Sequence, residues 1–163
     1  MADSYSPFEI ARFFIEKAHQ SGKDISPMKL IKLVYIAHAW NLAFYKKPLI
    51  SESVQAWKYG PVIESLYHGF KHFRNSTIPQ KEAESLPQVD VDAPTRALLE
   101  KVWEKYGALS AVHLSTLTHQ PDTPWDKVWN QNGGKDSRWT TIPDSMIQGF
   151  YQQKLVAPSG SGH

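Results

Sequence analysis

Cysteine is absent from this chain of 163 residues. Disulfides, thiolate zinc sites and cysteine nucleophiles are therefore excluded. No apolar run approaches the roughly 20 residues that a membrane-spanning helix needs, so we expect no membrane association. The start of the chain, Met1 to Ser6, also lacks the basic region and apolar run of a signal peptide. Together these absences favour a cytoplasmic protein.

The residue patterns that enzymes use are scarce as well. His68 and His72 are four apart, as two ligands on one helix face would be, but Gly69 stands where a metalloprotease motif has glutamate. The pair Gly133-Gly134 is not followed by the Lys-Ser or Lys-Thr of a phosphate loop. We therefore assign no catalytic, cofactor-binding or metal-binding residue and expect a protein that is not an enzyme. A metal enzyme built on the two histidines is the competing hypothesis, which elemental analysis would test.

Net charge is +2, which is too small to indicate nucleic-acid binding, but it is unevenly distributed. Residues 1–81 contain 11 Lys and Arg against 6 Asp and Glu, whereas residues 82–163 contain 7 against 10. An acidic partner would be drawn to the first half, although a solvated basic face without function explains the same numbers. Basic and aromatic residues do alternate near Lys58 and Arg74, yet no basic recognition helix follows. Direct nucleic-acid binding is therefore not favoured.

Helical signals dominate the chain. Ser6-Pro7-Phe8-Glu9 is typical of a capping box, with the serine accepting from the Glu9 amide and the glutamate reaching back. Further helix starts are indicated at Ser26-Pro27, Asp92, Ser110, Pro124 and Pro143. The second helix, to about Tyr45, is apolar enough to be central, and His38 within it should be a hydrogen-bonded core residue. We predict a mainly α protein, a compact single-domain bundle of about six helices with a short β element near residues 49–59.

The segment from Leu49 to Tyr59 has no helical period and indicates an extended stretch or short hairpin. Gly60 and Pro61 then predict a rigid elbow, in which the proline presets the first turn of a helix over residues 62–73. Trp57 should point the same way as Tyr59, with Trp40 and Tyr67 as neighbours. Residues 75–91 are expected to form a mobile loop.

Two stretches carry a resemblance to a known family. The first is Met28–Trp40 and the second is Ala56–Tyr67, which contains Trp-Lys-Tyr-Gly-Pro-Val. Pro48-Leu49 lies between them, His119–Trp125 supplies T-H-x-x-x-P-W-like spacing, and Ile142-Pro143 precedes a closing helix. These stretches resemble the SocA-like antitoxin family, or Panacea domain, found in phage-associated proteins, with patterns K-L-x-K-L-x-Y-x-A-x-x-W and E-A-W-x-Y-G-P-V-x-x-x-L-Y.

The likeness covers about residues 7–155, and Gln55 replaces the usual glutamate of the second pattern. We assign residues 1–157 to this domain. Residues 158–163 resemble a flexible linker running into an expression tag.

The resemblance implies an antitoxin of a toxin–antitoxin system, which neutralises a cognate toxin by direct binding. Either a homo-oligomer or a hetero-oligomer with the toxin is compatible with this role. Family members act on diverse toxins, including enzymes of the small alarmone synthetase type. It also implies two alternatives: an adaptor that delivers the toxin to a cytoplasmic protease, and a phage-associated protein without a toxin partner. The chain shows no additional DNA-binding region, so transcriptional autoregulation is not expected.

Roles for individual residues follow from the motifs. Trp40, Trp57, Gly60, Pro61, Tyr67 and Trp125 belong to the family patterns and are predicted to hold the fold together. The residues predicted to face a partner are Lys58, Tyr59, Phe73 and Arg74, because they combine rings and positive charge beside the predicted elbow.

Overall fold

The computed structural model describes residues 4–137 and 140–156. Its α-helices are α1 (Pro7–Gln20), α2 (Pro27–Tyr45), α3 (Glu64–Phe70), α4 (Lys81–Glu84), α5 (Ala93–Tyr106), α6 (Ala111–Thr118), α7 (Pro124–Asp126) and α8 (Asp144–Val156). Three short helical turns accompany them: η1 (Lys71–Phe73), η2 (Lys127–Gln131) and η3 (Gly134–Asp136). The mainly α prediction is confirmed. The described residues hold eight α-helices, of which α4 and α7 are single turns.

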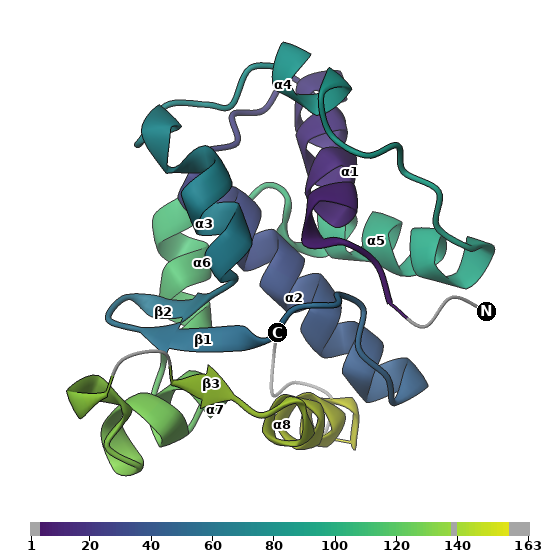
Figure 1. The fold of residues 1–163 in the computed structure, drawn as a ribbon. Helices are drawn as coiled ribbons and strands as arrows, with labels where there is room; N and C mark the ends of the chain where they lie inside the picture. The colour runs from purple at the N-terminus through teal and green to yellow at the C-terminus, as the bar shows by residue number, and fades with distance from the viewer. Residues whose placement is uncertain (1–3, 138–139, 157–163) are drawn as a thin grey trace.

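Helix α2 forms the centre of the fold (Figure 1). It packs against α1, α5, α6 and α8, so nearly all of its side chains are buried. Its exposed residues, Met28, Phe44 and Tyr45, lie at its two ends. A helix that is apolar on every side is stable only where others surround it, which is why α2 takes the central place. Across residues 4–137 and 140–156, no helix is both long and apolar enough to cross a bilayer.

Side-chain caps set the starts of the helices as predicted. Ser26 accepts from the Lys29 amide at 3.3 Å, and Asp92 accepts from the Thr95 amide at 2.9 Å. The capping box predicted at Ser6 forms only in part. Its hydroxyl accepts from the Phe8 amide, and the Glu9 carboxylate instead accepts from the Asp90 amide at 2.7 Å. The glutamate thus ties α1 to the segment before α5 rather than closing its own helix.

The predicted β element near residues 49–59 is confirmed, and it belongs to a three-stranded sheet. Strands β1 (Val54–Trp57), β2 (Gly60–Val62) and β3 (Thr141–Ile142) are antiparallel in the order β2-β1-β3. The elbow prediction is wrong, because Pro61 lies in β2 and α3 begins only at Glu64. Proline is tolerated there because β2 is an edge strand. Ala56, the residue paired with Pro61, needs no acceptor in β2, because its amide donates to the Thr140 carbonyl on the other side of β1.

Residues 75–91 are more ordered in shape than the predicted loop, since they include α4. Ile78 is fully buried, and its amide donates to the Ile25 carbonyl at 2.8 Å. Arg12 donates through Nη1 to the Leu86 carbonyl at 2.9 Å. Residues 75–91 are therefore held by hydrogen bonds to α1 and to the segment that follows it.

Candidate functional site

The tip of the β1–β2 hairpin is the most prominent exposed feature among the motif residues. Trp57 pairs with Gly60, so Lys58 and Tyr59 form the two-residue turn. The Tyr59 side chain is 65% exposed, and the Lys58 ammonium lies 5.4 Å from the centre of its ring. The Tyr59 carbonyl accepts from the Ser115 hydroxyl at 3.0 Å. An exposed ring therefore stands on a backbone that α6 holds in place.

Lys32 supports the same tip from inside the protein. Its side chain is only 3% exposed, and its ammonium donates to the Pro61 carbonyl at 2.9 Å and to the Tyr59 carbonyl at 3.4 Å. The two carbonyls favour the charged form, but burial disfavours it more strongly. Burial lowers the pKa of Lys32 to about 7.

Gly60 is required by this arrangement. Its φ of +122° lies in a region that other residues rarely adopt. A Cβ atom at this position would stand 2.8 Å from the Lys32 ammonium nitrogen. The glycine thus serves the hairpin turn and makes room for the buried lysine.

Three of the predicted motif residues meet behind the tip. The rings of Trp57 and Tyr67 pack edge to face with centroids 5.0 Å apart. The Trp125 indole donates through Nε1 to the Trp57 carbonyl at 2.5 Å, which joins α7 to β1. Trp40 is not part of this cluster. Its Nε1 donates to the Tyr106 hydroxyl at 3.1 Å, on the α5 side of α2.

The four residues predicted to face a partner do not form one surface. Lys58 and Tyr59 lie at the hairpin tip, whereas η1, which contains Phe73, follows the far end of α3 (Figure 1). Phe73 is partly buried against the core, with the His72 ring 4.1 Å away, centre to centre. Arg74 is exposed, with a φ of +54°.

Sequence reasoning overlooked two motif lysines as structural residues. The first is Lys32, described above. The second is Lys29, whose ammonium donates to the Gly107 carbonyl at 2.6 Å and lies 5.7 Å from the centre of the Trp103 ring. Burial lowers the pKa of Lys29. The sequence could have indicated this, because the two lysines stand three apart in an otherwise apolar helix. Each must either bury its charge with a polar partner or extend its side chain out of the core.

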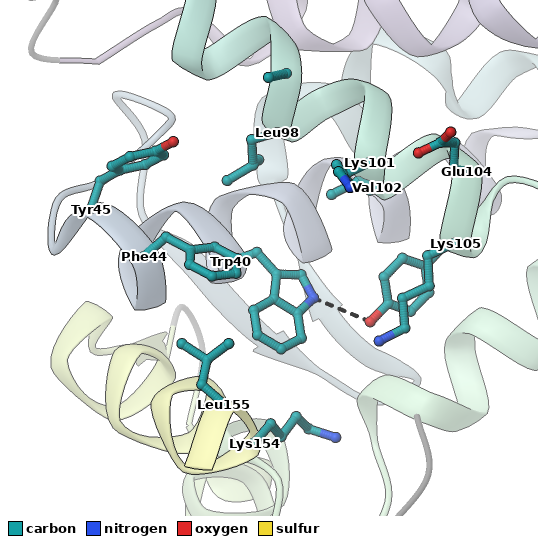
Figure 2. A pocket seen from close by; sticks show the side chains of 12 residues that line it. Trp40, Phe44, Tyr45, Leu98, Lys101, Val102, Glu104, Lys105, Lys154 and Leu155 are labelled. Atoms are coloured by element: carbon teal, nitrogen blue, oxygen red, sulfur yellow. Dashed lines mark hydrogen bonds between the residues drawn. The ribbon is translucent and has the colours of Figure 1, made fainter. Parts of the chain in front are cut away.

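A groove opens on another face, between α5 and α8 (Figure 2). Trp40 and Phe44 of α2 form its floor, and its volume is about 790 Å³. Lysines stand on both walls: Lys101 and Lys105 on α5, and Lys154 on α8. The sequence indicated none of this, since the lining residues come from three separate helices.

Two of the histidines, His38 and His68, have polar partners among the described residues. His38 is fully buried; its Nδ1 accepts from the Leu49 amide at 3.2 Å and its Nε2 donates to Asp144 at 3.0 Å, as expected for a core residue. His68 lies 3.6 Å from Glu64. In the part of the chain that the structure describes, no group of three or more histidine or carboxylate side chains is placed to hold a metal ion.

Comparison with known proteins identifies a class that this helical scaffold and motif cluster fit. Residues 30–126, from within α2 through α7, match the family described as antitoxin SocA-like, Panacea domain. The chain belongs to this family. It is also similar to the protein named Antitoxin SocA from Caulobacter vibrioides (strain NA1000 / CB15N), with 29% identity over 165 residues, covering 94% of this chain and 87% of that protein. No solved structure matches the chain.

Proposed function

We propose that this chain is an antitoxin that neutralises a cognate toxin by binding it directly and covering the toxin's active site. Membership of the SocA-like family and the similarity to a protein named Antitoxin SocA support the antitoxin role. The observation that carries direct binding is the hairpin tip, where Tyr59 is exposed on a fixed backbone.

The tip has the properties of a binding anchor. Tyrosine is enriched among the residues that dominate interface energies, because it buries a large ring with little loss of side-chain entropy. The Lys32 and Ser115 contacts fix the Tyr59 carbonyl before any partner arrives. A partner would then lose less free energy in ordering the loop. Tyr67, which is 38% exposed, packs against Trp57 of the same hairpin.

Co-expression with the protein encoded beside this chain tests the proposal. The neighbour should stop growth alone, and growth should return when the antitoxin is present. The two purified proteins should elute together on gel filtration. A neighbour that is not toxic, or two proteins that elute separately, would contradict the proposal.

Substitution of the tip locates the interface. The double change Lys58→Ala and Tyr59→Ala should weaken toxin binding at least about tenfold, as loss of a central aromatic anchor does, while the melting curve stays unchanged. Lys81→Ala is the control, because Lys81 is exposed on α4, which packs against α1 and away from the hairpin (Figure 1). Phe73→Ala and Arg74→Ala, measured separately, test whether the interface reaches η1. Full affinity in the tip variant would remove the tip from the interface.

Direct inhibition is separable from delivery to a protease. Purified antitoxin should inhibit the purified toxin with no protease present, and toxin half-life in cells should be unchanged or longer. A shortened half-life together with no inhibition in the purified system would instead assign the adaptor mechanism.

A further inference from the structure

We infer that the groove between α5 and α8 is a second docking site, which takes an amphipathic helix of the toxin with carboxylates along its edges. The inference rests on the proposed function, because it takes the toxin as the partner. It concerns a face formed mainly by α2, α5 and α8, whereas the hairpin tip rests on α6.

The floor of the groove suits apolar side chains. Trp40 is buried and its indole N–H is already donated to Tyr106, so Trp40 presents ring surface to the groove (Figure 2). Phe44 of the floor is 55% exposed, and two further apolar side chains beside it are exposed, Tyr45 at 41% and Leu155 at 44%. These are among the most exposed large apolar residues described. Such gathering of apolar surface in a concave site is typical of binding sites.

The rim of the groove is positively charged. Lys101 and Lys105 stand one helical turn apart on α5, and Lys154 faces them from α8 (Figure 2). Within the described residues, none of the three has a carboxylate oxygen within 4.0 Å. Glu104 is the one acidic residue among the groove-lining residues.

The charges on the two walls also repel each other. Burial, and then the nearby positive charge of Lys105, lower the pKa of Lys154. A carboxylate placed between the walls would relieve this repulsion and pair with both ammonium groups. The complementary partner surface is therefore acidic at its edges and apolar at its centre.

A helix satisfies both demands at once. Backbone amides and carbonyls that enter an apolar groove need internal partners, and a helix supplies them. Helices α5 and α8 already flank the groove, and helices pack on one another at a usual separation of about 8–10 Å. Apolar residues at positions i, i+3, i+4 and i+7 would cover Trp40 and Phe44, leaving flanking positions to meet the lysines.

Charge reversal provides the first test, with the toxin as probe. Lys101→Glu with Lys105→Glu should slow association about tenfold and flatten its dependence on salt, because rim charges act mainly on encounter. Lys23→Glu with Lys81→Glu changes net charge equally, and neither residue lines the groove. That control should associate with nearly unaltered salt dependence. Equal behaviour of both variants would overturn the inference.

The groove floor provides the second test. Phe44→Asp should raise the dissociation rate about tenfold or more, since it puts a carboxylate in the apolar contact. Phe44 is 55% exposed, so the melting temperature should stay close to that of the wild type. An unchanged dissociation rate with an unchanged melting temperature would exclude the floor as a contact.

Crosslinking identifies the occupant. A benzoylphenylalanine at position 44 should attach to a toxin peptide that carries apolar residues at helical spacing and at least one carboxylate. The same group at position 81, on the exposed face of α4, should not. Attachment to a second copy, to another part of this chain or to nucleic acid would overturn the inference. If the wild type forms no complex with the toxin, the proposed function fails together with the groove; if it binds and only the groove variants behave as wild type, the groove alone fails.

Discussion

The buried Lys32 makes the stability of this protein depend on pH in a defined direction. The usual lysine pKa of 10.5 applies to the unfolded chain, and burial lowers it to about 7 in the folded protein. Between these values the unfolded chain binds one more proton than the folded one, so the free energy of unfolding rises with pH. The cost of burying the charge is fully present below about pH 7 and is relieved as pH rises toward 10.5.

The magnitude follows from the proton difference. One full proton corresponds to about 1.4 kcal/mol per pH unit. From pH 8 to 9.5 the folded lysine is mostly neutral and the unfolded one mostly charged. Lys32 should therefore contribute about 2 kcal/mol of increasing stability across that interval.

Lys32→Met is the informative variant, because it keeps an unbranched apolar stem and removes the titrating group. Its free energy of unfolding should lose the 2 kcal/mol rise that Lys32 contributes from about pH 8 to 9.5. Lys29 and Lys154 also have pKa values lowered by burial, but they contribute equally to both proteins and cancel in the difference. Measurements should stop at about pH 9.5, because burial raises the pKa of Tyr35 and Tyr151, whose titration acts in the opposite direction above about pH 10.

Urea unfolding followed by tryptophan fluorescence measures the effect at a series of pH values. Lys81→Met, on the exposed face of α4, is the control and should keep the wild-type slope. Parallel lines for wild type and Lys32→Met would refute the reasoning. Such a result would mean that the ammonium stays charged in the folded protein, held by the Pro61 and Tyr59 carbonyls.

Three further substitutions test the support of the hairpin and the core. Gly60→Ala should lower the free energy of unfolding by about 1–3 kcal/mol, because φ is positive and the added Cβ meets Lys32; urea unfolding at pH 7 measures this, and a neutral result would contradict the crowding. Trp125→Phe should cost about 1–3 kcal/mol in the same assay by removing the indole N–H that donates to the Trp57 carbonyl, and wild-type stability would contradict a stabilising role for this bond. His38→Leu should cost about 1–3 kcal/mol or more, since it removes the acceptor for backbone amides after α2; calorimetry would detect it, and an unchanged melting temperature would argue against the buried hydrogen bonds.

The helices were predictable because their signals are local. A cap residue and the amide that it binds lie within three residues, as at Ser26 and Asp92. The central position of α2 was also predictable, because its apolar character on all sides has one stable solution. The half-formed capping box shows the limit: Glu9 had a local partner available, yet it binds the Asp90 amide, far away in sequence.

Strands β2 and β3 and the groove could not be predicted from local patterns, although the extended character of β1 could. Pro61 signals a helix start by propensity and an edge strand by context, and only the pairing of β2 with β1 decides between them. Strand β3 is only two residues long and lies far from β1 in the sequence. The groove depends on how α5 and α8 diverge over α2, so its lysines had no distinctive spacing. Each of these features is set by tertiary packing.

The motif residues fall into two groups, those that are buried and those whose side chains are exposed. Lys32 and Gly60 are buried and connect α2 to the hairpin, so the fold itself accounts for their place in the family pattern. Tyr59 belongs to the same pattern, yet its side chain is 65% exposed and the described hydrogen bonds use only its carbonyl. The fold therefore gives no reason for a ring at this position, whereas a contact shared by family members would. Lys105 and Lys154 of the groove lie outside the quoted motifs, as a contact specific to one toxin would. We therefore expect the hairpin tip to serve binding in general and the groove to select the partner, so that groove substitutions change which toxin is neutralised and tip substitutions abolish neutralisation altogether.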